Sequence, residues 1–151
     1  MFTPNFWWLT KVLLYNSIFH CLLIRTDRAL AKNKSKILIV EDDMIISLVV
    51  ENMIKKLGHS LVGKTASGEE AVEMAKEHKP DIILMDIRLK GEMDGIEAVS
   101  IIREHIDTNV IYLTGNSDKA NYDRARATDC VDLISKPFTI GELSRSLDLV
   151  P

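Results

Sequence analysis

Residues 37–43 read Ile-Leu-Ile-Val-Glu-Asp-Asp, four consecutive apolar residues followed at once by three carboxylates. A short, uniformly apolar run rich in β-branched residues is typical of a strand that is buried on both faces of a parallel sheet. Two further runs have the same character, Ile82-Ile83-Leu84-Met85 and Val110-Ile111-Tyr112-Leu113. Val131 to Ile134 is another candidate strand, and Leu61-Val62 is a weaker one. The chain therefore contains five candidate strands.

Helical patterns separate these strands. Apolar residues recur at helical spacing after Asp43, and Gly58 provides a stop signal. Ser117–Thr128 has only small apolar residues, which predicts a loosely held helix. Capping boxes mark three more helix starts: Ser67 with Glu70, Asp94 with Glu97, and Thr139 with Glu142. The helix that begins at Ser67 is expected to end at about Lys79. Alternating strands and helices predict an α/β fold with a doubly wound, five-stranded parallel sheet.

Polar side chains follow the candidate strands at their carboxyl ends, where doubly wound sheets hold their ligands. Three nearby carboxylates repel one another unless a cation joins them, and oxygen ligands suit Mg²⁺. A lysine and a threonine hydroxyl suit phosphoryl oxygens. Singly, each feature has a structural explanation, as a helix cap, a turn residue or a loop. Together they predict a site at which an acidic nucleophile accepts a phosphoryl group. The residues of this predicted site are Glu41, Asp42, Asp86, Thr114 and Lys136.

Five segments together resemble the receiver domains of two-component response regulators, over about Lys36 to Leu149. They are Ile37 to Asp43, Pro80 to Asp86, Met93-Asp94-Gly95, Leu113-Thr114 and Lys136-Pro137-Phe138. The resemblance implies a flavodoxin-like sheet with strand order 2-1-3-4-5.

The resemblance also implies roles for single residues. Asp86 is the expected phosphoacceptor, and Thr114 and Lys136 are expected to grip the phosphoryl group. Lys136-Pro137 corresponds to a peptide bond that is usually cis in the family. The expected Mg²⁺ ligands are Asp42 and Asp86 directly, Glu41 through water and the Arg88 main-chain carbonyl. One departure is Leu133, where the family often has Tyr or Phe; another is the short final helix.

The implied function is a phosphorylation switch rather than a turnover enzyme, with slow self-dephosphorylation at most. A sensor histidine kinase would phosphorylate Asp86 in the presence of Mg²⁺, and the changed conformation would signal to a downstream effector protein. Two alternatives stay open. One is a phosphorylation-independent binding module of the same fold. The other is an aspartyl-phosphate phosphohydrolase, which is disfavoured because Arg88 stands where such enzymes usually carry a second aspartate.

Charge separates the chain into an N-terminal leader and linker, residues 1–35, and a receiver domain, residues 36–151. The domain has a net charge of −7, so direct nucleic-acid binding is not expected. The leader contains an apolar run at residues 6–24, which leaves three interpretations open: a membrane anchor or interfacial helix, a signal peptide, or translated sequence upstream of the true start. We expect a cytoplasmic domain, with membrane contact only through residues 6–24.

Two groups of residues receive structural interpretations. The histidines of the domain are interpreted as surface residues, and four methionines as core residues: His59, His78 and His105; Met44, Met53, Met74 and Met85.

Overall fold

The computed structural model describes residues 34–115 and 119–151. Its five parallel strands form one sheet in the order β2-β1-β3-β4-β5, which confirms the predicted fold class and strand order. The strands are β1 (Lys36–Val40), β2 (Ser60–Thr65), β3 (Ile82–Asp86), β4 (Asn109–Gly115) and β5 (Asp132–Lys136).

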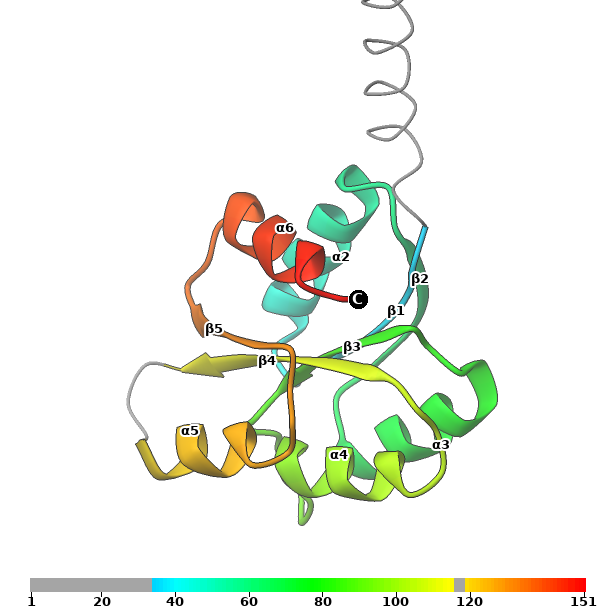
Figure 1. The fold of residues 1–151 in the computed structure, drawn as a ribbon, viewed down its shortest axis with the longest axis vertical. Helices are drawn as coiled ribbons and strands as arrows, with labels where there is room; N and C mark the ends of the chain where they lie inside the picture. Colours follow the sequence, from blue (N-terminus) through cyan, green and yellow to red (C-terminus); the bar gives the residue numbers. More distant parts are fainter. Residues whose placement is uncertain (1–33, 116–118) are drawn as a thin grey trace, which may run out of the picture. The chain divides into compact units, whose positions relative to one another are not determined.

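Helices cover both faces of the sheet (Figure 1). Helices α2 (Met44–Lys56) and α6 (Ile140–Asp148) lie on one face. Helices α3 (Gly68–His78), α4 (Gly95–Arg103) and α5 (Lys119–Arg126) lie on the other. Each face has its own apolar core, because successive strand residues point to opposite sides. Leu38 and Tyr112 belong to the core under α3, α4 and α5, whereas Ile39 and Leu113 belong to the core under α2 and α6.

Side-chain caps begin several helices where the sequence predicts them. Asp43 caps α2, and its Oδ1 accepts hydrogen bonds from the main-chain N–H groups of the next turn. The capping boxes of α4 and α6 are confirmed. The box predicted for α3 is only half formed. Ser67 accepts from the Glu70 N–H, but the Glu70 carboxylate accepts instead from the Thr65 hydroxyl at 2.5 Å, because that buried hydroxyl lies at the adjacent strand end.

Two of the structural interpretations are wrong. Met44 is 84% exposed rather than in the core, because it lies at the first position of α2 on the side that turns away from the sheet. Three more apolar side chains of that helix are exposed with it: Ile45, Leu48 and Val49. We call these four residues the α2 apolar patch. His59 is buried rather than on the surface, and its Nδ1 accepts a hydrogen bond from the Ser35 N–H.

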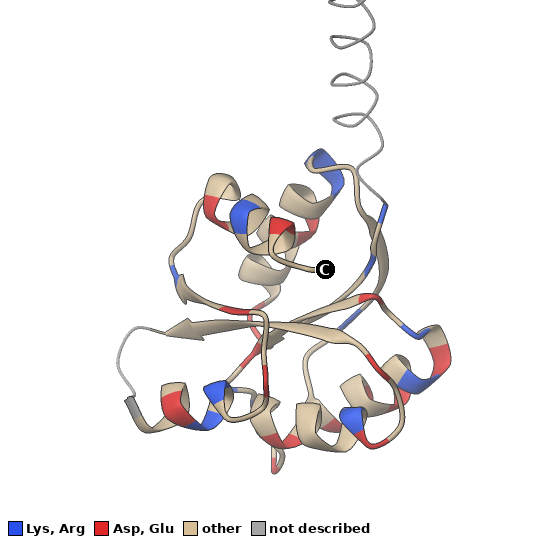
Figure 2. Ribbon diagram, in the orientation of Figure 1, with Lys and Arg blue, Asp and Glu red and all other residues tan. Residues whose placement is uncertain are grey.

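Charged residues of the described chain lie on the helices, at the strand ends and in the loops. Acidic and basic side chains are interleaved along α3, α5 and α6 (Figure 2). Within residues 34–115 and 119–151, no helix has the length and apolar character needed to cross a membrane. The predictions for residues 1–33, including the apolar run 6–24, lie outside the described residues.

Candidate functional site

Three carboxylates meet at the carboxyl ends of β1 and β3, two neighbouring interior strands of the sheet. Glu41 and Asp42 follow β1, and Asp86 is the last residue of β3, which pairs with β1 in parallel register. One oxygen from each carboxylate lies within 4.8 Å of the others. Glu41 and Asp86 are buried. We call Glu41, Asp42 and Asp86 the acidic pocket.

Lys136 brings a positive charge into the acidic pocket from the edge strand β5. Its Nζ lies 2.5 Å from Glu41 Oε2 and 2.6 Å from Asp86 Oδ2. The lysine side chain is only 15% exposed, and those of Glu41 and Asp86 are 1% and 8% exposed. To reach Asp86 on β3, Lys136 extends across the end of β4, which lies between the two strands. The peptide bond that follows it, Lys136-Pro137, is cis as expected.

Burial and charge oppose each other in this cluster. Burial raises the pKa of the Glu41 carboxyl, and the nearby Asp86 charge acts in the same direction. These effects outweigh the hydrogen bond from Lys136, so the Glu41 pKa is raised. Burial alone would lower the pKa of Lys136. The hydrogen bonds to Asp86 and Glu41 outweigh it and raise that pKa. Lys136 is therefore held as a cation between two carboxylates.

The Asp86 carboxylate is held at both oxygens. Oδ2 accepts from Lys136 Nζ, and Oδ1 accepts from the Arg88 main-chain N–H at 3.0 Å. The Asp86 backbone is also closely packed, because a Cβ added at Gly95 would lie 2.0 Å from the Asp86 carbonyl oxygen. This contact explains why glycine follows the capping residue Asp94, a requirement that the sequence reasoning missed.

Thr114 lies at the end of β4, but its hydroxyl does not contact Asp86. It donates to the main-chain carbonyl of Gly115 at 3.1 Å. The structure thus brings together Glu41, Asp42, Asp86 and Lys136, and leaves the threonine hydroxyl bonded to its own strand end.

A second lysine at the acidic pocket was not predicted. Lys90, in the loop between β3 and α4, places its Nζ 3.2 Å from Asp42 Oδ2. Nothing in the strand-end pattern indicates this residue. Its position depends on the conformation of the loop that follows Asp86.

The donor chemistry of the acidic pocket fits Mg²⁺. Its carboxylates offer hard oxygen ligands close together, whereas sites for softer metals use histidine or cysteine. Asp42 is 14% exposed, compared with 1% for Glu41 and 8% for Asp86, so it is the most accessible of the three carboxylates. Such a site can combine one or two carboxylates with the waters that Mg²⁺ retains.

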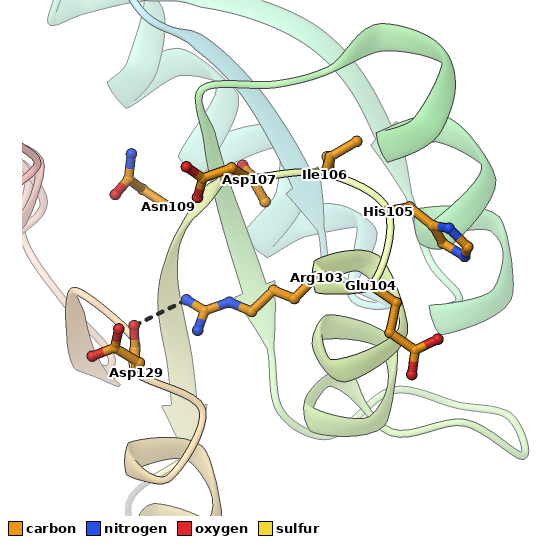
Figure 3. Close-up of a pocket in the computed structure, with 8 residues that line it drawn as sticks. Arg103, Glu104, His105, Ile106, Asp107, Asn109 and Asp129 are labelled. Carbon is orange, nitrogen blue, oxygen red and sulfur yellow. Dashed lines mark hydrogen bonds between the residues drawn. The ribbon is translucent and has the colours of Figure 1, made fainter.

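A second hollow lies near the opposite end of the sheet, around the start of β4 (Figure 3). Arg103 extends across it and donates to the main-chain oxygens of Thr128 and Asp129, beyond the end of α5. Glu104 and His105 point away from the guanidinium (Figure 3). Arg103 therefore links the end of α4 to the turn that follows α5.

Comparisons with known proteins point to one family. A family model described as the response regulator receiver domain matches residues 37–148. Chemotaxis protein CheY of Thermotoga maritima is 35% identical over 117 residues, covering 76% of this chain and 96% of that protein. Transcriptional regulatory protein PdtaR of Mycobacterium tuberculosis is 34% identical over 114 residues, covering 76% of this chain and 55% of that protein. The chain spans about half the length of several curated relatives that it matches.

A solved structure adds information about the metal. The receiver domain of the sensor histidine kinase PA1611 from Pseudomonas aeruginosa has a magnesium ion coordinated in its active site cleft. It is 33% identical to this chain, with a TM-score of 0.70, and the match covers 77% of this chain and 96% of that one.

Proposed function

Because the chain belongs to the response regulator receiver domain family, we propose that it is a phosphorylation switch of a two-component system in which Asp86 accepts the phosphoryl group. The observation that carries this proposal is the Asp86 carboxylate itself. It lies among acidic side chains, with Lys136 on one oxygen and a main-chain N–H on the other. A fixed carboxylate beside a lysine is poised for attack on phosphorus.

In the proposed step an Asp86 oxygen attacks the phosphorus of a phosphohistidine on a sensor histidine kinase. The new P–O bond forms as the donor P–N bond breaks, and the leaving imidazole takes up a proton. Mg²⁺ bound by Asp42 and Asp86, with Glu41 and the Arg88 carbonyl in support, would supply positive charge to the phosphoryl oxygens. Lys136, already hydrogen-bonded to Asp86, carries the second positive charge.

The conformational response would begin at Thr114. Its hydroxyl donates to the Gly115 carbonyl in the structure, and a phosphoryl group on Asp86 offers a more strongly charged acceptor. A change of partner would pull the end of β4, the strand that precedes α5. Among the described side chains of α5, only Ala125 is buried, so this helix has few contacts to resist a shift. A downstream effector protein would read the altered surface.

The kinase must contact the rim of the acidic pocket to deliver the phosphoryl group. The α2 apolar patch begins at Met44, which is two residues after Asp42 of the acidic pocket. Exposed apolar side chains on a helix suit packing against helices of a partner. The interleaved charges in Figure 2 and the net charge of −7 support a protein partner rather than a nucleic acid.

The arrangement favours a switch over a phosphohydrolase. Arg88 occupies the position where a second aspartate would act as acid and base, and its contact with Asp86 is through the main-chain N–H. This contact holds the carboxylate and offers no proton-transfer group.

The test is incubation with Mg²⁺ and either acetyl phosphate or phosphoramidate, followed by intact mass measurement. Phosphoramidate tests transfer from a P–N bond. The control variant is Asp107→Asn, at an exposed position away from the acidic pocket. The wild type and this control should both gain one phosphoryl group. Asp86→Asn should gain none while unfolding like the wild type. Stoichiometric labelling of Asp86→Asn at another residue would refute the assignment.

A further inference from the structure

The loop between β3 and α4 places a lysine at the acidic pocket that the proposed function leaves unused. Lys90 lies four residues after Asp86, and its Nζ is 3.2 Å from Asp42 Oδ2. The lysine side chain is 85% exposed, whereas the carboxylate that it contacts is 14% exposed. The ammonium group therefore covers Asp42 from the solvent side.

The two lysines divide the pocket between them. Lys136 is hydrogen-bonded to Glu41 and Asp86, and Lys90 pairs with Asp42. Each carboxylate of the acidic pocket thus has a lysine partner in the structure. Lys136 is largely enclosed, but Lys90 is held by this one exposed ion pair and can leave at little cost.

Asp42 cannot give its full charge to a metal ion while it holds the Lys90 ammonium. We propose that Lys90 is a tethered cation that competes with Mg²⁺ for Asp42 and so weakens the apparent Mg²⁺ affinity of the pocket. This inference rests on the proposed function only in taking the pocket as the Mg²⁺ site. When the metal binds, Lys90 moves into solvent, where its exposed side chain has room.

The loop backbone allows this movement. Gly91 follows Lys90 with φ = 149°, a conformation that other residues rarely adopt. The nearest atom to a Cβ added there would be a Glu69 carboxylate oxygen at 3.8 Å, so the position is not tightly packed. A glycine directly after the lysine lets the side chain change direction without moving β3.

The test is calorimetric titration of the whole chain with Mg²⁺, without any phosphodonor. Exposed lysine–carboxylate pairs of this kind correspond to a change in affinity of about 1.5- to 5-fold. Lys90→Met should bind Mg²⁺ tighter by that factor at low ionic strength, and the difference should shrink as KCl is raised. Lys90→Arg should stay near the wild type. Lys56→Met is the matched control, because it removes an exposed lysine at the far end of α2.

A double-mutant cycle separates competition at Asp42 from a general charge effect. In an Asp42→Asn background, Lys90→Met should leave the Mg²⁺ affinity unchanged. Persistence of the full effect there would overturn the proposal, as would unchanged or weaker Mg²⁺ binding by Lys90→Met alone. The labelling of Asp86 by acetyl phosphate is a separate readout, so Mg²⁺ competition without phosphorylation would refute the proposed function and leave this inference standing.

Discussion

Replacing Lys136 by methionine tests whether its charge holds the acidic pocket together. Methionine keeps most of the side-chain volume, so the change mainly removes the ammonium group. Glu41 and Asp86 would then face each other with side chains only 1% and 8% exposed. Removing one partner of a fully buried ion pair costs about 3–5 kcal/mol. We expect the free energy of unfolding to fall by about 2–4 kcal/mol here, because the Lys136 side chain is still 15% exposed and Glu41 can take up a proton.

The loss of unfolding free energy in Lys136→Met should depend on pH. Lys136 lowers the pKa of Glu41, so its removal raises that pKa further above the unfolded value. A raised pKa in the folded state adds stability below the unfolded pKa, and that stability is lost as pH rises through the folded pKa. The deficit of Lys136→Met relative to the wild type should therefore be large at pH 8 and smaller at pH 5. Mg²⁺ should reduce it as well, because a cation replaces the missing charge.

The measurement is urea unfolding of both proteins at pH 5, 7 and 8, in EDTA and then in Mg²⁺. Lys64→Met is the control, because it breaks a more exposed ion pair with Glu51 and should change stability by about 1 kcal/mol or less. A deficit below about 0.5 kcal/mol, or one that is the same at pH 5 and pH 8, would contradict the reasoning. Either result would mean that water solvates the Glu41 and Asp86 carboxylates well enough without the lysine.

Three further predictions concern the rest of the domain. Burial raises the pKa of Tyr112 to about 12 and its hydroxyl bonds to Thr128, so Tyr112→Phe should cost about 1 kcal/mol at pH 7. Wild-type stability should fall between pH 10 and 12 as the unfolded tyrosine ionises first, and urea unfolding should show that the variant lacks this loss. Gly95→Ala should lower the free energy of unfolding by about 1–3 kcal/mol and slow labelling by acetyl phosphate, because the new Cβ would meet the Asp86 carbonyl. Unchanged stability and labelling would show that this contact does not matter for the site. Deleting residues 1–33 should leave a cooperatively unfolding domain that acetyl phosphate still labels, because every described strand and helix lies after them; loss of the cooperative transition would contradict this.

The central strands were predictable because their environment is uniform. The residues of Ile37–Val40 and Ile82–Met85 are buried on both faces of the sheet, so only apolar side chains fit and the run is visible without the structure. The edge strand β2 was harder to predict. The sequence indicates a strand at Leu61-Val62, whereas the strand extends from Ser60 to Thr65. Edge strands have less buried surface and so a weaker apolar signal.

Helix α2 shows where periodicity fails. Apolar residues occupy more than one of its faces. The helically spaced series correctly predicted the side that packs against the core: Ile46, Val50, Met53 and Leu57. Met44 carries the same apolar signal but is exposed. Hydrophobicity is a property of the residue, whereas burial depends on which neighbours the fold supplies.

The sequence by itself determined the α/β fold and the four charged residues that meet in the site: Glu41, Asp42, Asp86 and Lys136. These are readable because parallel strands bring their carboxyl ends to one edge, so a residue's position along its strand already locates it. Only the tertiary structure decided the contacts made by loops and freely rotating groups. The Thr114 hydroxyl turns to the Gly115 carbonyl, and Lys90 reaches Asp42 from a loop. No repeating pattern sets the direction of such groups, because their orientation follows from the local backbone and from competition among nearby partners.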